Sequence, residues 1–264
     1  MTAVVDPRRG GKITSLQDRS GSEWLAQTDP AREVTAEARF VDAEMAGWDE
    51  CAPTIAACTV RGRELPDHGD LWNRPMTPDG QELHAHGETF EYRFSRSMSE
   101  SPGGGIRLTY ECSTPLRNLP FLWAAHPQFL AETGSSVQID ERASRALDVE
   151  HPEVGYVPWS EELATIDSLE RGSTRKLWVH PDEAPTWAKL VSPRRGTLAL
   201  SWSEGCRYLA VWFDHAAVNT QPVIAIEPAL AFSDSLATAI ELGRAAHLEP
   251  GKPLRWWVDI DLAD

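Results

Sequence analysis

The chain has 264 residues, of which 41% are apolar, so it can form a large hydrophobic core. Its formal net charge of −15 disfavours nucleic acids and anionic membranes as partners, because both require clustered basic side chains. The sequence has neither a signal-like segment at its start nor an apolar run of about eighteen residues. We therefore expect a cytoplasmic protein with no nucleic-acid partner and no membrane partner.

The cysteines do not have the spacing of a metal site. Cys51, Cys58, Cys112 and Cys206 form no CxxC pair, and the expected state is four free thiols. With no nearby histidine motif of the zinc type, we expect no metal and no other cofactor.

Short alternating or apolar runs, separated by turn sequences, predict that most elements are β-strands. In ETFEYRFS, for example, Phe90, Tyr92 and Phe94 alternate with Glu91 and Arg93. Stretches such as SPGGG and SPRRG have the composition of turns. The predicted strands are residues 11–18, 88–98, 105–114, 197–202, 207–214, 222–228 and 254–262.

Helix patterns are few and short. Residues 233–245 have a candidate N-cap in Ser233 and a candidate end at Gly243, and residues 158–170 can form another short helix. The intervals 66–86 and 140–195 are long and polar, and we interpret them as loops on a β scaffold. No linker divides the chain, so the sequence predicts one all-β domain over residues 1–264, a sandwich or a barrel.

Two neighbouring segments, GWDECAPTI and LPDHGDLWNRP, form the first candidate site. Their polar and aromatic residues lie within 26 residues of sequence (74 − 49 + 1) and are Asp49, Glu50, Asp67, His68, Asp70, Trp72 and Arg74. Carboxylates, an imidazole and an aromatic ring are the groups that recognise a polar ligand. A solvated turn explains DHGD equally well, and the two interpretations stay open at this point.

The other candidates are single polar residues inside apolar runs. FLWAAHPQFL contains His126, which can be a core histidine or a catalytic one. PVIAIEPALAF contains Glu227, which either marks a solvent-exposed strand end or is buried and needs a partner. Burial would raise the pKa of a carboxyl group towards neutrality, as a general base requires. Local pattern does not pair residues so far apart.

Taken together and in this order, these segments resemble the aldose 1-epimerase (galactose mutarotase-like) superfamily. The likeness also includes VVDPRRGGKITSLQDRSGSEWL, RYLAVWFD and LEPGKPLRWWVDIDL, so it covers most of the chain. It implies a large antiparallel β-sandwich, the galactose mutarotase-like supersandwich, with few short helices. The implied partner is a small-molecule carbohydrate held in a cleft on one sheet, and no cofactor is implied.

The resemblance also implies roles for individual residues. His126 matches the histidine that protonates the ring oxygen of a pyranose, and Glu227 matches the base that takes the proton of the anomeric hydroxyl. His68 matches the sugar-binding histidine of an HG motif. The remaining substrate-binding candidates, which lie in the segments placed at the cleft, are Asp49, Asp67, Trp72, Arg74 and Trp212.

Several departures from the family pattern leave the substrate open, since the arginine expected upstream of the HG motif and the loop aspartate that contacts sugar hydroxyls also have no clear match. Ala125 stands where an asparagine is common, and ALAF follows Glu227 where small polar residues are usual. The alternatives are a carbohydrate-binding protein without turnover and a sugar-phosphate epimerase. In the second case Arg61, Arg63 and Arg74 are the candidates to bind the dianion.

Overall fold

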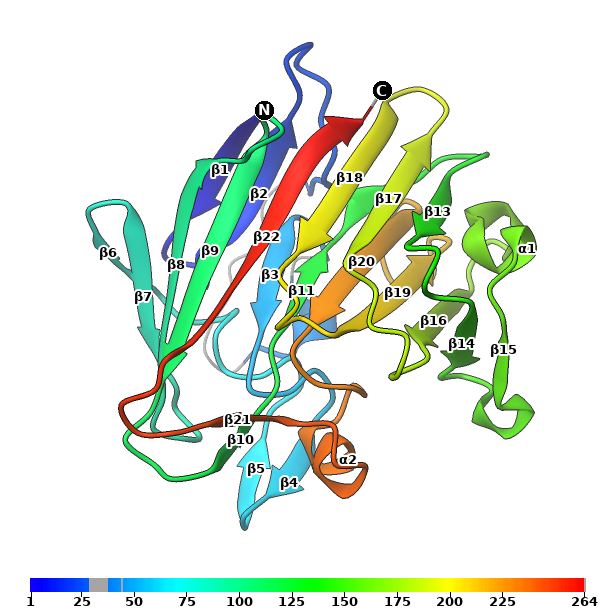
Figure 1. The fold of residues 1–264 in the computed structure, drawn as a ribbon. Helices are drawn as coiled ribbons and strands as arrows, with labels where there is room; N and C mark the ends of the chain where they lie inside the picture. The colour runs from blue at the N-terminus through cyan, green and yellow to red at the C-terminus, as the bar shows by residue number, and fades with distance from the viewer. Residues whose placement is uncertain (29–37, 44, 264) are drawn as a thin grey trace.

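Two large antiparallel sheets packed face to face contain most of the strands (Figure 1). The structure is a computed structural model that describes residues 1–28, 38–43 and 45–263. The first sheet is built from β1 (Thr2–Asp6), β2 (Lys12–Gln17), β3 (Trp48–Cys51), β11 (Ala124–Pro127), β12 (Phe129–Leu130), β14 (Arg145–Asp148), β15 (Tyr156–Pro158), β16 (Thr174–Val179), β19 (Tyr208–Asp214) and β20 (Val223–Ala229). Its order is β1-β2-β3-β11-β20-β19-β16-β14-β15, with β12 also paired to β20.

The second sheet has eight strands and lies in front of the first in Figure 1. Its order is β13 (Ser136–Ile139), β17 (Trp187–Ser192), β18 (Gly196–Trp202), β22 (Leu254–Ala263), β9 (Ile106–Ser113), β8 (Arg93–Glu100), β7 (Glu82–His86) and β6 (Thr77–Asp79). Two small ladders pair β4 (Cys58–Val60) with β5 (Arg63–Leu65), and β10 (Leu119–Phe121) with β21 (Ala246–Leu248).

The helices in the described residues are short. They are α1 (Glu161–Ala164), α2 (Leu236–Glu241) and three 3₁₀ turns at Phe40–Asp42, Pro152–Val154 and Ile166–Ser168. The N-cap of α2 is Ser235, whose side chain accepts a hydrogen bond from the Thr238 N–H. Ser233, the candidate from sequence, instead has a positive φ of 96°. None of the described helices is long and apolar enough to cross a membrane.

The predicted all-β sandwich is confirmed, and each predicted strand region contains a strand. The strand predicted at 88–98 begins only at Arg93, although Phe90, Tyr92 and Phe94 are all buried as their alternation indicated. The interpretation of 66–86 and 140–195 as loops is wrong, because these intervals contain β6, β7 and β14 to β17. Their strands are short and mix charged with apolar residues, so composition concealed them.

Alternation along β3 sends two adjacent carboxylates to opposite faces of the sheet. Glu50 points between the two sheets, where Arg96 of β8 donates a hydrogen bond to it at 2.7 Å. The Trp123 indole donates to the same carboxylate at 2.8 Å, and the Tyr110 hydroxyl donates at 3.1 Å. The side chains of Glu50 and Arg96 are both 0% exposed, so this ion pair crosses the centre of the core.

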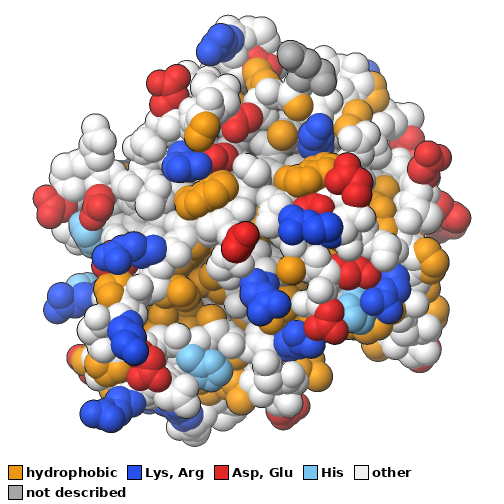
Figure 2. Space-filling model, viewed as in Figure 1, with side chains coloured by type: hydrophobic (Ala, Val, Ile, Leu, Met, Phe, Trp, Pro, Cys, Tyr) orange, Lys and Arg blue, Asp and Glu red, His pale blue; other side chains and the backbone are white. Residues whose placement is uncertain are grey.

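The outer face of the eight-stranded sheet has a different character. Acidic and basic side chains are interspersed over it rather than gathered by sign (Figure 2). An example is the pair of Arg255 on β22 with Glu111 on β9, whose nitrogen and oxygen are 2.7 Å apart while the two side chains are 67% and 39% exposed. Solvent-exposed pairs of this kind contribute little to stability.

These two ion pairs predict very different costs of losing an arginine. Arg96→Met leaves Glu50 buried without its cation, which should lower the free energy of unfolding by about 3–5 kcal/mol. Arg255→Met, the matched control on the exposed face, should cost less than about 1 kcal/mol. Urea denaturation of both variants measures the difference, and equal losses would contradict the role assigned to the buried pair.

Candidate active site

The strand register sets His126 beside Glu227. In the pairing of β11 and β12 with β20, Ala124 lies opposite Ala229 and Phe129 lies opposite Ile224. The same register places His126 opposite Glu227, with both side chains on the face of the sheet that is turned away from the core. His126 Nε2 is 3.9 Å from Glu227 Oε1. Two residues 101 positions apart (227 − 126) are therefore neighbours.

The two carboxylate oxygens of Glu227 have different surroundings. Lys176 of β16 donates a hydrogen bond from Nζ to Oε2 at 2.8 Å. Oε1, the oxygen near His126, has no hydrogen-bond partner among the described residues. Glu227 is 0% exposed, and this burial raises the pKa of its carboxyl group, although the Lys176 ammonium opposes the rise. A buried carboxylate with one unoccupied oxygen is suited to accept a proton.

The pKa of the His126 imidazole is shifted in the direction opposite to that of Glu227. The imidazole is 4% exposed, and burial lowers its pKa well below the usual range, assisted by the neighbouring charges of His68 and Lys176. The pKa of Glu227 rises while that of His126 falls, so the ordinary gap between a carboxyl group and an imidazole becomes smaller. A smaller gap lowers the cost of moving a proton from one group to the other through a bound molecule.

His68 reaches the site from a tight turn after β5. Its own φ is positive, at 59°, and the next residue, Gly69, has a φ of 75°. A Cβ on Gly69 would lie 1.9 Å from the Ala52 carbonyl oxygen, so only glycine fits there. Asp70 anchors the turn by accepting a hydrogen bond from the Tyr92 hydroxyl at 2.5 Å. Glycine therefore follows His68 because the turn packs directly against the backbone of Ala52.

Aromatic rings cover the two histidines. The ring of Phe40 stacks on His68 with centroids 3.6 Å apart and planes at 7°, and it meets the His126 ring edge-on at 5.4 Å. The two imidazoles themselves are 5.3 Å apart. Trp72 packs against Phe40 and is 4% exposed. The ring centroid of Trp212 is 5.8 Å from that of His126, and Trp212 is partly exposed. Of the two tryptophans, Trp212 has the more accessible ring.

The remaining predicted residues differ in how closely they join this centre. Asp49 lies opposite His126 on β3 and accepts a hydrogen bond from the buried Lys12 at 2.5 Å. Asp67 Oδ2 is 3.0 Å from His68 Nδ1, with a side chain that is 46% exposed. Arg74 is turned towards Glu88, with their charged atoms 3.0 Å apart. Asp49 is part of the buried centre, whereas Asp67 and Arg74 lie towards its edge.

Four residues of the site were not anticipated from the sequence: Lys12, Phe40, Lys176 and Asp234. Lys176 lies in an interval interpreted as a loop, where a lysine is unremarkable. Asp234 follows Glu227 by seven residues in IEPALAFSDS and returns to the same ammonium group. The apolar residues that follow Lys176 in TRKLWV are the signal from which a buried cation could have been predicted.

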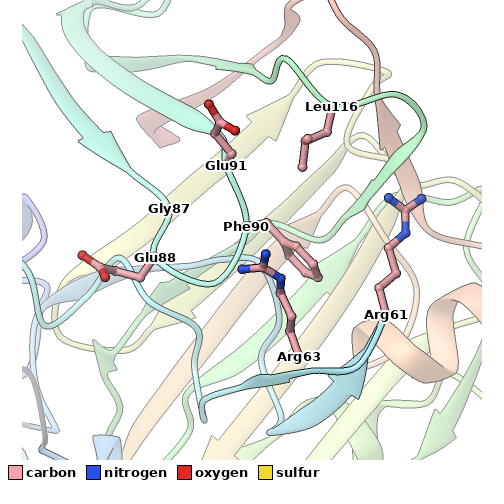
Figure 3. Close-up of a pocket in the computed structure, with 7 residues that line it drawn as sticks. All are labelled: Arg61, Arg63, Gly87, Glu88, Phe90, Glu91 and Leu116. Atoms are coloured by element: carbon pink, nitrogen blue, oxygen red, sulfur yellow. The ribbon is translucent and has the colours of Figure 1, made fainter.

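A separate cavity of about 400 Å³ contains two of the three arginines considered for phosphate binding (Figure 3). Arg61 and Arg63 line it together with Phe90, and Glu88 and Glu91 are also part of its wall. His68, His126 and Glu227 do not line it. The cluster at the β4–β5 hairpin is therefore distinct from the histidine–glutamate centre.

A metal centre is not formed by the described side chains. Across residues 1–28, 38–43 and 45–263, no group of three or more histidine, cysteine, aspartate and glutamate side chains is arranged to hold a metal ion.

Comparison with solved structures identifies the fold. The Slr1438 protein of Synechocystis superposes with a TM-score of 0.74 at 18% identity, covering 98% of this chain and 90% of that one. The GalM/aldose epimerase homologue of C. elegans gives 0.65 at 12%, covering 98% and 94%. The galactose 1-epimerase of Lactobacillus acidophilus gives 0.61 at 12%, covering 98% and 90%. No family model and no curated protein sequence matches the chain.

The chain therefore has the fold of the aldose 1-epimerase and galactose mutarotase proteins. The resemblance drawn from the sequence motifs is confirmed at the level of the fold. At identities of 12–18% the comparison describes architecture, and the chemistry has to be argued from the residues of this chain.

The depressed pKa of His126 predicts a specific dependence of stability on pH. In the unfolded chain a histidine takes up a proton near its ordinary pKa of about 6.5, whereas folded His126 stays neutral there. His126 therefore lowers stability as pH falls through about 6.5, by up to roughly 1.4 kcal/mol per pH unit. His126→Gln should flatten this slope in urea titrations at a series of pH values. The exposed His247 provides the control, and an unchanged slope in His126→Gln would contradict the assignment.

Proposed function

We propose that this protein is an aldose 1-epimerase-like enzyme that interconverts the anomers of a sugar by opening and closing its ring. The observation that carries the proposal is the 3.9 Å separation between His126 Nε2 and Glu227 Oε1, both buried and on one face of the sheet. The ring oxygen and the anomeric hydroxyl of a pyranose are both bonded to C1. A proton donor and a proton acceptor this close can therefore serve both atoms of one sugar.

The reaction starts from the form of the pair in which His126 is protonated and Glu227 is ionised, a form that burial makes less populated because it lowers the pKa of His126 and raises that of Glu227. His126 gives its proton to the ring oxygen while Glu227 Oε1 takes the proton of the anomeric hydroxyl. The bond from C1 to the ring oxygen breaks, and C1 becomes a carbonyl carbon. Rotation about C1–C2 turns the other face of the carbonyl to the hydroxyl that was formed from the ring oxygen. As that hydroxyl attacks C1 and the ring closes, its proton returns to His126 and Glu227 returns its proton to the former carbonyl oxygen. The pair then has its initial protonation, and no external reactant is consumed.

The opposed pKa shifts support this cycle. Ring opening converts an imidazolium and a carboxylate into a neutral imidazole and a carboxylic acid. Burial favours the second state, because it lowers the pKa of His126 and raises that of Glu227. The two protonation states of the pair are thereby brought closer in free energy, which keeps the open-chain intermediate accessible.

A neutral sugar fits the site better than a sugar phosphate. The buried lysines, Lys12 and Lys176, are engaged by the carboxylates of Asp49, Glu227 and Asp234. Arg61 and Arg63 face a different cavity. A phosphate dianion is bound by several cationic hydrogen-bond donors, and lysines that are already paired with carboxylates are poorly placed to serve as such donors. We therefore favour an unphosphorylated aldose, with His68 and Trp212 as its contacts beside the reacting centre.

Removal of the base should abolish turnover without changing the fold. Glu227→Gln keeps the volume of the side chain but cannot accept the anomeric proton, so the rate should fall by about 10²–10⁴-fold. His126→Asn should fall by a similar factor, since the ring oxygen loses its donor. Polarimetry of freshly dissolved α-glucose and α-galactose measures these rates.

His68→Asn tests a binding role for His68. This substitution should raise KM more than it lowers kcat. Full activity of Glu227→Gln would show that the base is elsewhere. Sugar binding by the wild-type protein without any acceleration of mutarotation would instead favour a carbohydrate-binding protein, and acceleration confined to glucose 6-phosphate would favour a sugar-phosphate epimerase.

A further inference from the structure

Lys176 reaches Glu227 from two strands away. The two residues lie on β16 and β20, and β19 runs between these strands. The β19 residue opposite Glu227 is Ala210, and a methyl group there leaves room for the lysine stem to cross the sheet. The lysine side chain is 13% exposed, so its ammonium group is held among protein atoms. Extending a long side chain across a strand into a buried place costs conformational entropy and desolvation, which its partners must offset.

Those partners are two carboxylates. Lys176 Nζ is 2.8 Å from Glu227 Oε2 and 2.9 Å from Asp234 Oδ1. Asp234 is fixed in turn by the indole of Trp178, which donates to the same oxygen at 3.3 Å. Burial alone would lower the pKa of Lys176, but the charges of Asp234 and Glu227 outweigh it and raise the pKa above its ordinary value. The ammonium therefore stays charged wherever Glu227 is charged.

We propose that Lys176 is the positioning residue of the site: it holds Glu227 by Oε2, keeps the carboxylate ionised although buried, and leaves Oε1 directed at the substrate beside His126. The inference rests on the proposed function, because it assigns a role within that reaction. Asp234 is the second half of the device, since it orients the ammonium and limits the charge that Glu227 experiences.

The groups that surround Glu227 come from several elements, and the charged ones do not all act in the same direction. Lys176 of β16, Asp234 after β20 and His68 after β5 act on its pKa through their charges, and His126 of β11 and the Cys51 thiol of β3 also lie near it. Among them, Lys176 lowers the pKa of Glu227 and Asp234 raises it. Removing each in turn should therefore move the titration of Glu227 in opposite directions, whereas a merely structural role predicts no such pattern.

The test uses ¹³C labelling of glutamate carboxyl groups, with the Glu227 signal assigned by its absence in Glu227→Gln. In Lys176→Met the Glu227 titration should move to higher pH, and in Asp234→Asn to lower pH, each by about one unit, a tenfold change in the proton equilibrium. Lys176→Arg, which keeps the charge, should stay within a fraction of that shift. This measurement needs no sugar.

The pH dependence of kcat/KM provides the second readout. Because the Lys176 charge acts on both members of the pair, Lys176→Met should move both limbs of the profile to higher pH, with a loss of about tenfold or more at neutral pH. An unmoved Glu227 titration in folded Lys176→Met, with normal wild-type turnover, would overturn the inference and leave the proposed function intact. Opposite shifts in the two variants without wild-type turnover would support the Lys176–Glu227 coupling while rejecting epimerisation.

Discussion

A carboxylate buried in a β-sheet is unfavourable unless a cation is buried with it, and this requirement organises both the core and the site. Glu50 is paired with Arg96 between the sheets, and Asp49 and Glu227 are paired with Lys12 and Lys176 on the other face. Every one of these pairs joins two different strands. The ion pairs therefore fix how β2, β3, β8, β16 and β20 lie relative to one another.

The same constraint gives the site its chemistry. Glu227 is engaged through one oxygen and open through the other, because its cation approaches from the side opposite His126. His126 Nε2 is 3.9 Å from Glu227 Oε1, which is longer than an ordinary hydrogen bond, and burial lowers the pKa of His126. The proposed roles of His126 as acid and Glu227 as base rest on this difference between two adjacent groups of one sheet. The ring of Phe40 stacks on the imidazole of His68 and meets that of His126 edge-on, so it is part of the wall of the site.

The sequence was informative where local pattern and chemistry coincide. Alternation predicted the strand that contains Phe94, and apolar runs predicted those that contain Trp212 and Glu227. Motif resemblance selected His68, His126 and Glu227, which the fold brings together. Burial of Glu227 resolves the choice between a strand end in solvent and a buried base candidate.

Long-range partners were beyond the reach of local pattern. Lys176 is 51 residues from Glu227 in sequence (227 − 176), and Arg96 is 46 residues from Glu50 (96 − 50). Which cation meets which carboxylate is decided by strand order, and strand order was not available from spacing. The interval 140–195 was interpreted as a loop, so the strand on which Lys176 lies, β16, was not predicted.

The most direct test of the account is a crystal structure of Glu227→Gln soaked with glucose or galactose, since the inactive variant should retain the sugar. The account predicts a pyranose with its ring oxygen within hydrogen-bonding distance of His126 Nε2 and its anomeric hydroxyl beside the side chain of residue 227, with the Phe40 ring displaced from His68. A sugar bound only elsewhere, such as in the cavity of Arg61 and Arg63, with Phe40 still stacked on His68, would contradict it.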